Sequence, residues 1–293
     1  VSYLVLDYNP NHNPKACQAL QDTLLSLKKN LSKVFSFEIF LFDQGSEQEH
    51  KSCLRNFQNT MDLDFSILSF KRNVGVSRAI NIFSRIARGN ILALITSDVM
   101  ITKGMDEDLI GKISNDPEIY QISSVTNHSS LLYQTILVTE PFGTSTVDVS
   151  HLFKGYQRYI VTELTATFWS RQVFEKIGYF DERWKACHEN NDFALRSFLN
   201  GGCAAISYDS YVWHHHNMTT KTGAIKHAYD GYLFDNAFDY RVLLNLWDQK
   251  WPLLKNMIDI YMPLGSKIAK DFPGLLETFS HNIFLPFLQD VKY

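Results

Sequence analysis

The sequence lacks several features that would assign it to a function class directly. Its 293 residues include only four cysteines, Cys17, Cys53, Cys187 and Cys203, and no two of them form a Cys-x-x-Cys pair. This scattered spacing argues against a zinc knuckle or a redox motif and is typical of reduced thiols in a cytosolic protein.

Long apolar runs and a strong charge of one sign are also missing. No stretch reaches the roughly 18 apolar residues of a membrane-spanning helix, and no charged-then-apolar leader is visible. The formal net charge of -3 gives no basic surface, so we expect no general binding to nucleic acid. We therefore expect a soluble, cytoplasmic protein. Its hydrophobic content of 45% is sufficient for a large core.

What the sequence has is a regular alternation of strand and helix patterns. Near-continuous apolar runs at residues 2–7, 37–42, 65–70 and 90–98 are typical of strands buried on both faces of a parallel sheet. Between them, Pro14 begins a helix whose apolar stripe has spacings of three and four, and a polar helical segment extends to about Met61. Ser77 is the expected N-cap of a third helix that stops at Gly89. This order predicts an α/β fold with right-handed crossovers.

Each of the four predicted strands ends in polar residues, at 7–9, 43–46, 72–75 and 96–98. In open α/β sheets, ligands bind beyond the carboxyl ends of the strands. We therefore expect a nucleotide site at this edge, with Asp98 placed to meet a metal or a phosphate-bearing ligand. The alternative is that Asp98 only begins the next turn.

The second half of the sequence is less regular. Residues 127–158 are rich in Ser, Thr, Gly and His, and their length suits a loop that faces the substrate. A helix is expected at 171–177, another from about Asn190, and a strand around 204–208. From about Thr222 onward, helical and aromatic-rich periodicity predicts a C-terminal helical extension.

Six motifs in this order resemble the inverting, family-2 glycosyltransferases of the GT-A fold, from Val1 to about Thr220. They are the opening strand with its Tyr-Asn at 8–9, Asp-Gln-Gly-Ser at 43–46, Arg-Asn-Val-Gly at 72–75 with Asn81, Thr-Ser-Asp at 96–98, Gly-Tyr-Phe-Asp-Glu at 178–182, and Glu-Asn-Asn-Asp at 189–192 with Arg196. The resemblance implies a GT-A type, Rossmann-like mixed and mainly parallel sheet flanked by helices. It divides the chain into a catalytic domain, residues 1–221, and a C-terminal helical extension, residues 222–293.

The resemblance also implies an activity: inverting transfer of a sugar from a nucleotide-diphosphate donor to a glycan or another hydroxyl-bearing acceptor. A UDP-sugar is the first expectation and dTDP-rhamnose the second. Asp43 would accept hydrogen bonds from the base, and Tyr8 would pack against its ring. For Arg78, contact with the diphosphate and a solvated helix face remain alternatives. The implied nucleotide-binding residues are Tyr8, Asn9, Asp43, Arg72, Asn73, Gly75, Arg78 and Ser97.

The expected cofactor is a divalent metal, Mn²⁺ or Mg²⁺, because Asp98 offers the hard oxygen that these ions prefer. Thr96 stands where the family's metal motif has its first Asp, so a further ligand is needed. Strand alternation places His214 and His216 on one face and His215 on the other. Residues 211–216 stand where members of this family often carry a histidine that contacts the metal or the phosphates, so the resemblance implies that His214 or His216 completes the metal site.

Inversion requires one base that deprotonates the acceptor hydroxyl. The family's usual base position is Asn190 in this chain, and an amide cannot take up the proton as a carboxylate does. Glu189 and Asp192 remain as neighbours. We favour Glu189, with Asp192 paired to Arg196 one turn further along the helix.

Two other function classes remain open. A non-catalytic binding module with this fold is favoured by Thr96 and Asn190, both neutral where carboxylates are usual. A sugar-phosphate nucleotidyltransferase would carry a Gly-rich loop with Arg or Lys straight after the first strand, and residues 8–15 lack such a loop.

Overall fold

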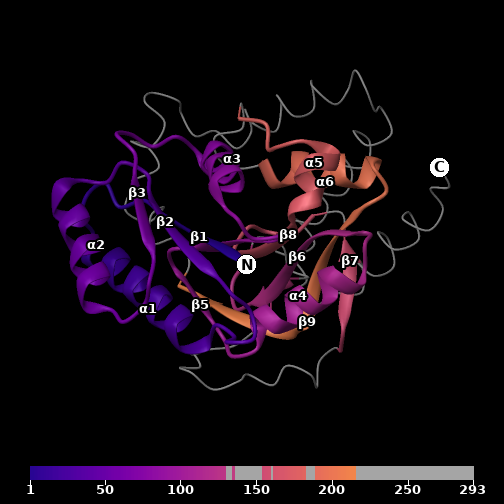
Figure 1. Ribbon diagram of the computed structural model, residues 1–293, viewed down its shortest axis with the longest axis horizontal. Helices are drawn as coiled ribbons and strands as arrows, with labels where there is room; N and C mark the ends of the chain where they lie inside the picture. The colour runs from indigo at the N-terminus through magenta and orange to yellow at the C-terminus, as the bar shows by residue number, and fades with distance from the viewer. Residues whose placement is uncertain (130–133, 136–153, 160, 183–188, 216–293) are drawn as a thin grey trace, which may run out of the picture.

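The computed structural model describes residues 1–129, 134–135, 154–159, 161–182 and 189–215 (Figure 1). His216 and the expected C-terminal helical extension, residues 222–293, lie outside this part of the chain, as does most of the expected loop at 127–158. None of the helices in the described part combines the length and the apolar composition needed to cross a membrane.

The described strands form one mixed sheet. Its order is β3-β2-β1-β4-β8-β6-β9-β5, and β7 pairs with β9 as a branch. β1, β2, β3 and β4 are mutually parallel, and so are β6 and β9, whereas β8 runs antiparallel between β4 and β6. The expected mixed, mainly parallel sheet is therefore confirmed. The strand bounds are β1 Ser2–Asp7, β2 Glu38–Asp43, β3 Ser66–Ser69, β4 Ile91–Thr96, β5 Val99–Ile101, β6 Ile119–Thr126, β7 Tyr156–Tyr159, β8 Ala166–Ser170 and β9 Cys203–His214.

Helices cover both faces of the sheet (Figure 1). They are α1 Pro14–Asn30, α2 Gln48–Thr60, α3 Val76–Ile86, α4 Met105–Asn115, α5 Arg171–Ile177 and α6 Glu189–Leu199. One core cluster joins α1, α2 and α4 to strand residues such as Val5, and a second joins α3, α5 and α6 to alternate residues such as Leu4. Because successive strand residues face opposite sides, the near-continuous apolar runs fill both cores.

The starts of helices α1 and α3 test the capping residues that were expected from the sequence. α1 begins at Pro14 as expected, and the Asn13 side chain caps it by accepting a hydrogen bond from the Lys15 N–H at 3.0 Å. The expected N-cap Ser77 is wrong: α3 begins two residues earlier than that cap implies, and Ser77 is buried in its first turn. Gly75 occupies the cap position with φ +86°, a left-handed conformation that glycine adopts without strain.

The segment after Asp98 places the remaining site residues. β5 runs antiparallel to β9 with Val99 opposite His214. β9 extends well beyond the expected strand at 204–208, because it pairs with β5, β6 and β7 along its length. This pairing carries the end of β9 to the residues that follow β4.

Candidate functional site

The polar ends of the parallel strands meet at one edge of the sheet, as expected. Asp7 at the end of β1 lies opposite Asp43 of β2, and Leu6 lies opposite Thr96 of β4. The Ser97 N–H donates to the Leu6 carbonyl at 3.2 Å. Since β1 separates β2 from β4, Asp43 and Thr96 are about two strand spacings, roughly 10 Å, apart.

Asp43 is fully buried, yet one of its carboxylate oxygens has no hydrogen-bond donor within the described residues. Its Oδ1 accepts the Ser46 N–H at 2.8 Å, and the Lys51 ammonium lies 4.0 Å from Oδ2. Buried polar atoms in proteins nearly always have a partner. Asp43 therefore offers an acceptor that an N–H of a ligand can satisfy.

The residues around Asp43 hold two loops together. Gln44 accepts a hydrogen bond from the Val74 N–H at 3.0 Å and donates to the Gly75 carbonyl at 3.3 Å. The Asn73 side chain accepts the Gly75 N–H at 2.8 Å, which leaves that amide tied to its own loop. Gln44 was not singled out by sequence reasoning, although it follows Asp43 directly in the polar end of β2.

The Asn9 side chain forms hydrogen bonds within the β1–α1 loop. Asn9 is buried; its Oδ1 accepts the Asn13 N–H at 2.7 Å, and its Nδ2 donates to the Asn13 carbonyl at 3.1 Å. Tyr8 is partly exposed and Arg72 is exposed. Of the expected nucleotide contacts in these loops, Tyr8 and Arg72 are therefore accessible, whereas Asn9 shapes the loop.

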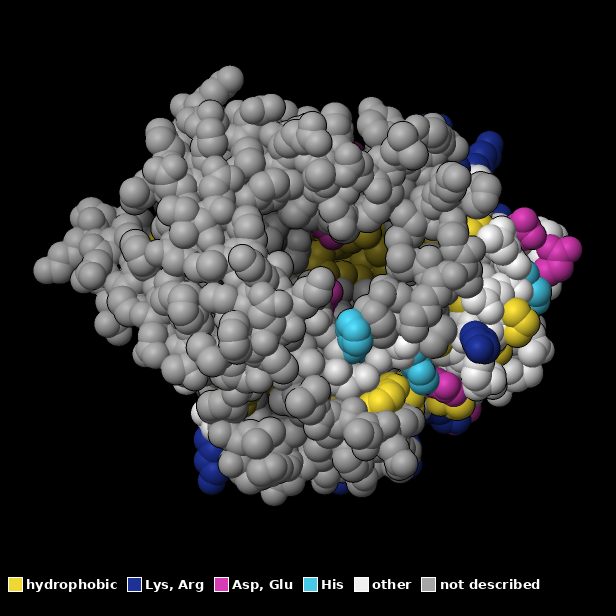
Figure 2. Space-filling model, turned by 180° about the vertical axis from the view of Figure 1, so that it is seen from behind, with side chains coloured by type: hydrophobic (Ala, Val, Ile, Leu, Met, Phe, Trp, Pro, Cys, Tyr) yellow, Lys and Arg dark blue, Asp and Glu magenta, His cyan; other side chains and the backbone are white. Residues whose placement is uncertain are grey.

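Asp98 and His214 lie side by side at the other end of this edge. His214 Nε2 is 3.3 Å from Asp98 Oδ2, and both side chains are largely buried. Burial acts to raise the pKa of Asp98, but the interactions with His214 and Thr96 together hold the pKa below its usual value. Burial acts to lower the pKa of His214, but Asp98, the His128 backbone and Glu163 together raise it. Figure 2 shows histidine and acidic side chains next to one another on one face of the molecule.

The backbone around His214 determines how its ring is presented. His214 Nδ1 lies 3.0 Å from the His128 carbonyl, so Nδ1 carries the proton and the Nε2 lone pair faces Asp98 when the ring is neutral. The Asn127 side chain accepts the His214 N–H at 2.6 Å and donates to the His214 carbonyl at 3.0 Å. A metal-binding histidine is oriented in the same way, by a backbone carbonyl on its other nitrogen.

This donor set fits a divalent cation. A carboxylate oxygen and an imidazole nitrogen, 3.3 Å apart, suit adjacent positions around Mn²⁺. The neighbouring His215 ring points elsewhere, with its Nε2 3.6 Å from Asp22 of α1. Asn127 was not identified from the sequence, because its role depends on the far end of β9.

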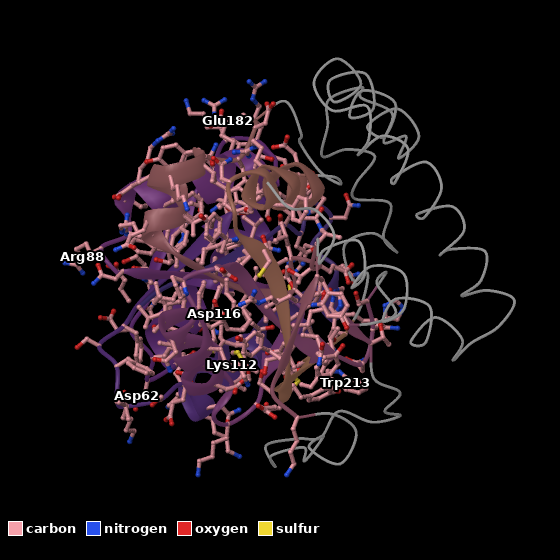
Figure 3. All side chains as sticks on the ribbon, turned by 90° about the vertical axis from the view of Figure 1, so that its right-hand side faces the viewer. Asp62, Arg88, Lys112, Asp116, Glu182 and Trp213 are labelled. Atoms are coloured by element: carbon pink, nitrogen blue, oxygen red, sulfur yellow. The ribbon has the colours of Figure 1, made fainter. Side chains whose placement is uncertain are left out.

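The helix α3 is fastened to the turn at residues 178–182. The Asn81 amide donates to the Phe180 carbonyl at 2.8 Å and to the Glu182 carboxylate at 3.1 Å, and its oxygen accepts the Phe180 N–H at 2.9 Å. Arg78 is exposed and lies 3.7 Å from Glu182, which projects from the surface in Figure 3. This position of Arg78 is compatible both with contact to the diphosphate and with a solvated helix face.

Three residues at the start of α6 were catalytic candidates. Asp192 accepts a hydrogen bond from Arg196 Nε at 2.9 Å, so the expected structural pair is present. Asn190 donates to the Thr162 carbonyl at 3.1 Å. Glu189, the first residue of α6, is buried.

Glu163 is an acidic residue that sequence reasoning missed. It is partly buried and lies near enough to His214 to contribute to raising the pKa of that ring. Its N–H donates to the Gln134 side chain at 2.8 Å. A carboxylate within the otherwise apolar and hydroxyl-rich stretch at 161–169 is the only signal that could have identified it.

Several solved structures are similar to this chain in fold. GalNAc-T7 with UDP, GalNAc and Mn²⁺ is 17% identical, with TM-score 0.57 and coverage of 73% of this chain and 43% of that one. The Pyrobaculum calidifontis mannosyltransferase PcManGT with GDP-Man and Mn²⁺ is 15% identical, with TM-score 0.54 and coverage of 73% and 56%. S. aureus TarS with UDP-GlcNAc is 17% identical, with TM-score 0.52 and coverage of 80% and 62%. The chain thus spans about half the length of these proteins.

A search of curated protein sequences finds no match. The sequence model of glycosyl transferase family 2, in contrast, matches residues 10–198. This match covers well over half of the chain and includes Asp43, Asp98 and Glu189, the first residue of α6. The chain belongs to glycosyl transferase family 2.

Proposed function

We propose that this protein is an inverting glycosyltransferase that moves a sugar from a nucleotide-diphosphate donor to an acceptor hydroxyl. Residues 1–221 would form the catalytic domain and residues 222–293 a C-terminal extension. The observation that carries the proposal is the Asp98–His214 pair, 3.3 Å apart, at the same sheet edge as the buried Asp43. Similar structures that hold UDP, UDP-GlcNAc or GDP-Man support a nucleotide-sugar donor.

The open oxygen of Asp43 fits a base that presents a ring N–H, such as uracil. Uracil presents an imide N–H, and this donor would satisfy Asp43 Oδ2, which lacks one. Thymine carries the same N–H, so dTDP-rhamnose is the second candidate donor. The accessible Tyr8 ring would pack on the base, while Arg72 and Arg78 would face the phosphates.

Asp98 and His214 would hold Mn²⁺ or Mg²⁺ close to Ser97. A bound cation would neutralise the charge that develops on the leaving diphosphate. The protein orients the imidazole for this role through the His128 carbonyl and the Asn127 side chain. His216 remains a further candidate ligand, outside the described residues.

Glu189 is our proposed catalytic base. It would take the proton of the acceptor hydroxyl as the oxygen attacks the anomeric carbon and the bond to the nucleotide diphosphate breaks. Asp192 is engaged by Arg196 and Asn190 is an amide, which leaves Glu189 as the carboxylate at the start of α6. Glu163, close to His214, is the second candidate.

Calorimetric titration of UDP with and without Mn²⁺ tests the donor site. His214→Asn should remove the Mn²⁺-dependent gain in UDP affinity, a loss of about tenfold or more, equivalent to about 1.4 kcal/mol. His215→Asn is the matched control, because its ring faces Asp22 instead. Equal Mn²⁺ responses in the two variants would refute the metal assignment.

Turnover distinguishes an enzyme from a binding module. Release of the nucleoside diphosphate should be measured with UDP- and dTDP-sugars across a panel of hydroxyl acceptors. Glu189→Gln should abolish transfer while UDP affinity is retained, and Glu163→Gln tests the rival base. Tight donor binding with no turnover by the unsubstituted protein would instead support the non-catalytic module.

A further inference from the structure

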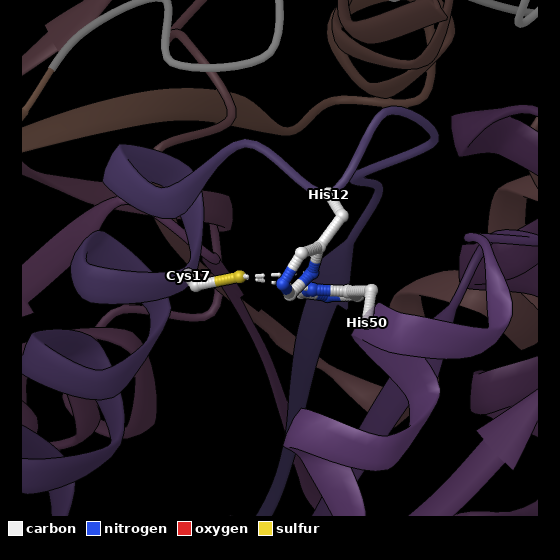
Figure 4. Close-up of side chains that lie close together, drawn as sticks. All are labelled: His12, Cys17 and His50. Atoms are coloured by element: carbon white, nitrogen blue, oxygen red, sulfur yellow. Dashed lines mark hydrogen bonds between the residues drawn. The ribbon is translucent and has the colours of Figure 1, made fainter.

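A second group of metal-ligating side chains lies away from Asp98 and His214, between the β1–α1 loop and the two helices that follow. His12 comes from the loop, Cys17 from α1 and His50 from α2 (Figure 4). Cys17 Sγ lies 3.3 Å from His50 Nδ1 and 3.7 Å from His12 Nδ1. The three donor atoms all lie within 4.8 Å of one another.

These distances match the geometry of a tetrahedral zinc site. With Zn–S bonds of about 2.3 Å and Zn–N bonds of about 2.0–2.1 Å, a sulfur and a nitrogen ligand lie about 3.5 Å apart. The two observed sulfur–nitrogen distances fall on either side of that value. Two imidazoles and a thiolate are also a donor set that suits zinc.

The surroundings orient these donors. Asp7 Oδ2 lies 2.6 Å from His50 Nε2, so the carboxylate accepts a hydrogen bond from Nε2–H and the Nδ1 lone pair faces Cys17. A carboxylate behind the ring is the usual outer contact of a zinc-binding histidine. The Asn9 amide lies 3.3 Å from Cys17 Sγ, where its N–H can stabilise a thiolate. His50 is completely buried and Cys17 nearly so, so exclusion from water would protect the bound ion.

We propose that His12, Cys17 and His50 bind a zinc ion. The ion would fasten the β1–α1 loop, which carries Tyr8, to helix α2. This site is distinct from the Asp98–His214 pair, and the proposal does not depend on the proposed transferase activity.

Metal analysis of the purified, intact protein tests the site directly. After treatment with a mild chelator under reducing conditions, we expect one zinc per chain by mass spectrometry. Replacement by Co²⁺ should give a thiolate-to-cobalt charge-transfer absorption. Cys17→Ser should remove this absorption, whereas Cys203→Ser, a buried cysteine of β9, should keep it.

A variant that is expected to keep its fold separates loss of zinc binding from loss of folding. His12 has φ +45°, a left-handed conformation that asparagine also tolerates, so His12→Asn should fold and still lose most of its zinc affinity. Asp7→Asn, which removes an outer contact, should weaken zinc binding roughly 10–100-fold. Asp98→Asn should leave it unchanged.

Three results would overturn the proposal. These are no zinc in the reduced protein, unchanged zinc affinity in the folded His12→Asn and Cys17→Ser variants, or loss of the zinc on replacement of Asp98. Rapid labelling of Cys17 by a thiol reagent in the zinc-loaded protein would contradict it as well, because a bound metal should protect the thiolate.

Discussion

Gly45 lies where the loop after β2 touches the loop after β3. Its φ is +85°, and a Cβ added there would lie 2.6 Å from the Arg72 Cα. Backbone atoms cannot move aside to relieve this contact, whereas the end of a flexible side chain can. The glycine therefore lets Asp43 and Arg72, both proposed to contact the donor, lie on adjacent loops.

Gly45→Ala should lower the free energy of unfolding by about 2 kcal/mol or more, because it adds a backbone clash to an unfavourable φ. Urea unfolding measures the change. Gly111→Ala is the control: it lies inside helix α4, where an added Cβ would meet open space, and should be neutral or stabilise by up to about 1 kcal/mol. Equal effects would contradict the close-approach explanation.

Asp116 joins α4 to β7. Its Oδ2 accepts hydrogen bonds from the Tyr156 hydroxyl at 2.6 Å and from Arg158 at 2.7 Å. Burial acts to raise the pKa of Asp116, but these bonds outweigh it and hold the pKa below its usual value. A lowered carboxyl pKa stabilises the fold above the unfolded value of 3.8, and this contribution is lost as the pH falls towards the folded pKa.

Asp116→Asn should therefore lower the free energy of unfolding by about 1–2 kcal/mol at pH 7, with a smaller difference below about pH 4. Urea unfolding at both pH values measures it. Asp62→Asn is the control, since Asp62 is almost fully exposed and its pair with Lys28 contributes little; Figure 3 shows both carboxylates. A loss that is independent of pH would contradict the electrostatic origin.

At the scale of elements, α3 depends on a turn almost one hundred residues away. Asn81 is buried and makes three hydrogen bonds to Phe180 and Glu182. The helix packs on the same face of the sheet as α5 and α6. This link therefore connects the loop that carries Arg72 and Gly75 to the half of the protein that carries Glu189.

Asn81→Ala should lower the free energy of unfolding by about 2–3 kcal/mol, because it leaves the buried Phe180 N–H and carbonyl without their side-chain partner. Asn56→Ala, at an exposed position inside α2, should cost nothing, since alanine favours helix. Denaturant unfolding compares the two variants. Similar results for both variants would contradict the stabilising role of the Asn81 hydrogen bonds.

At the scale of the whole molecule, β9 holds the second half of the sheet together. It pairs with β5, β6 and β7, and most of its residues are buried. It also delivers His214 to Asp98. The integrity of the sheet and the assembly of the proposed metal site thus depend on the same strand.

A protein of residues 1–221 should unfold cooperatively, whereas residues 1–202 should not, because removal of β9 exposes three strand edges and opens the core. Circular dichroism in urea and size-exclusion chromatography measure this. A cooperative transition in the shorter protein would contradict the central role of β9. Failure of the longer one to fold would refute the proposed boundary at 221.

Local patterns were sufficient to predict much of the fold. The four parallel strands, the start of α1 at Pro14 and the helix at 171–177 were expected and are present. Each depends on apolar periodicity or on a cap within a few residues. The start of α3 was displaced by two residues, because Gly75 and not Ser77 occupies the N-cap position, with a positive φ that only the folded backbone reveals.

The candidate site likewise has some features that local sequence predicts and others that depend on tertiary contacts. The sequence by itself determined the strand–helix alternation, and with it the gathering of Asp7, Asp43 and Thr96 at one edge, because parallel strands align their carboxyl ends. Only the tertiary structure decided that the Asn127 side chain hydrogen-bonds to the His214 backbone and that Glu163 lies near the His214 ring. The same holds for the proximity of Cys17 to His12 and His50. These contacts join elements far apart in the chain, whose pairing depends on how the whole core packs.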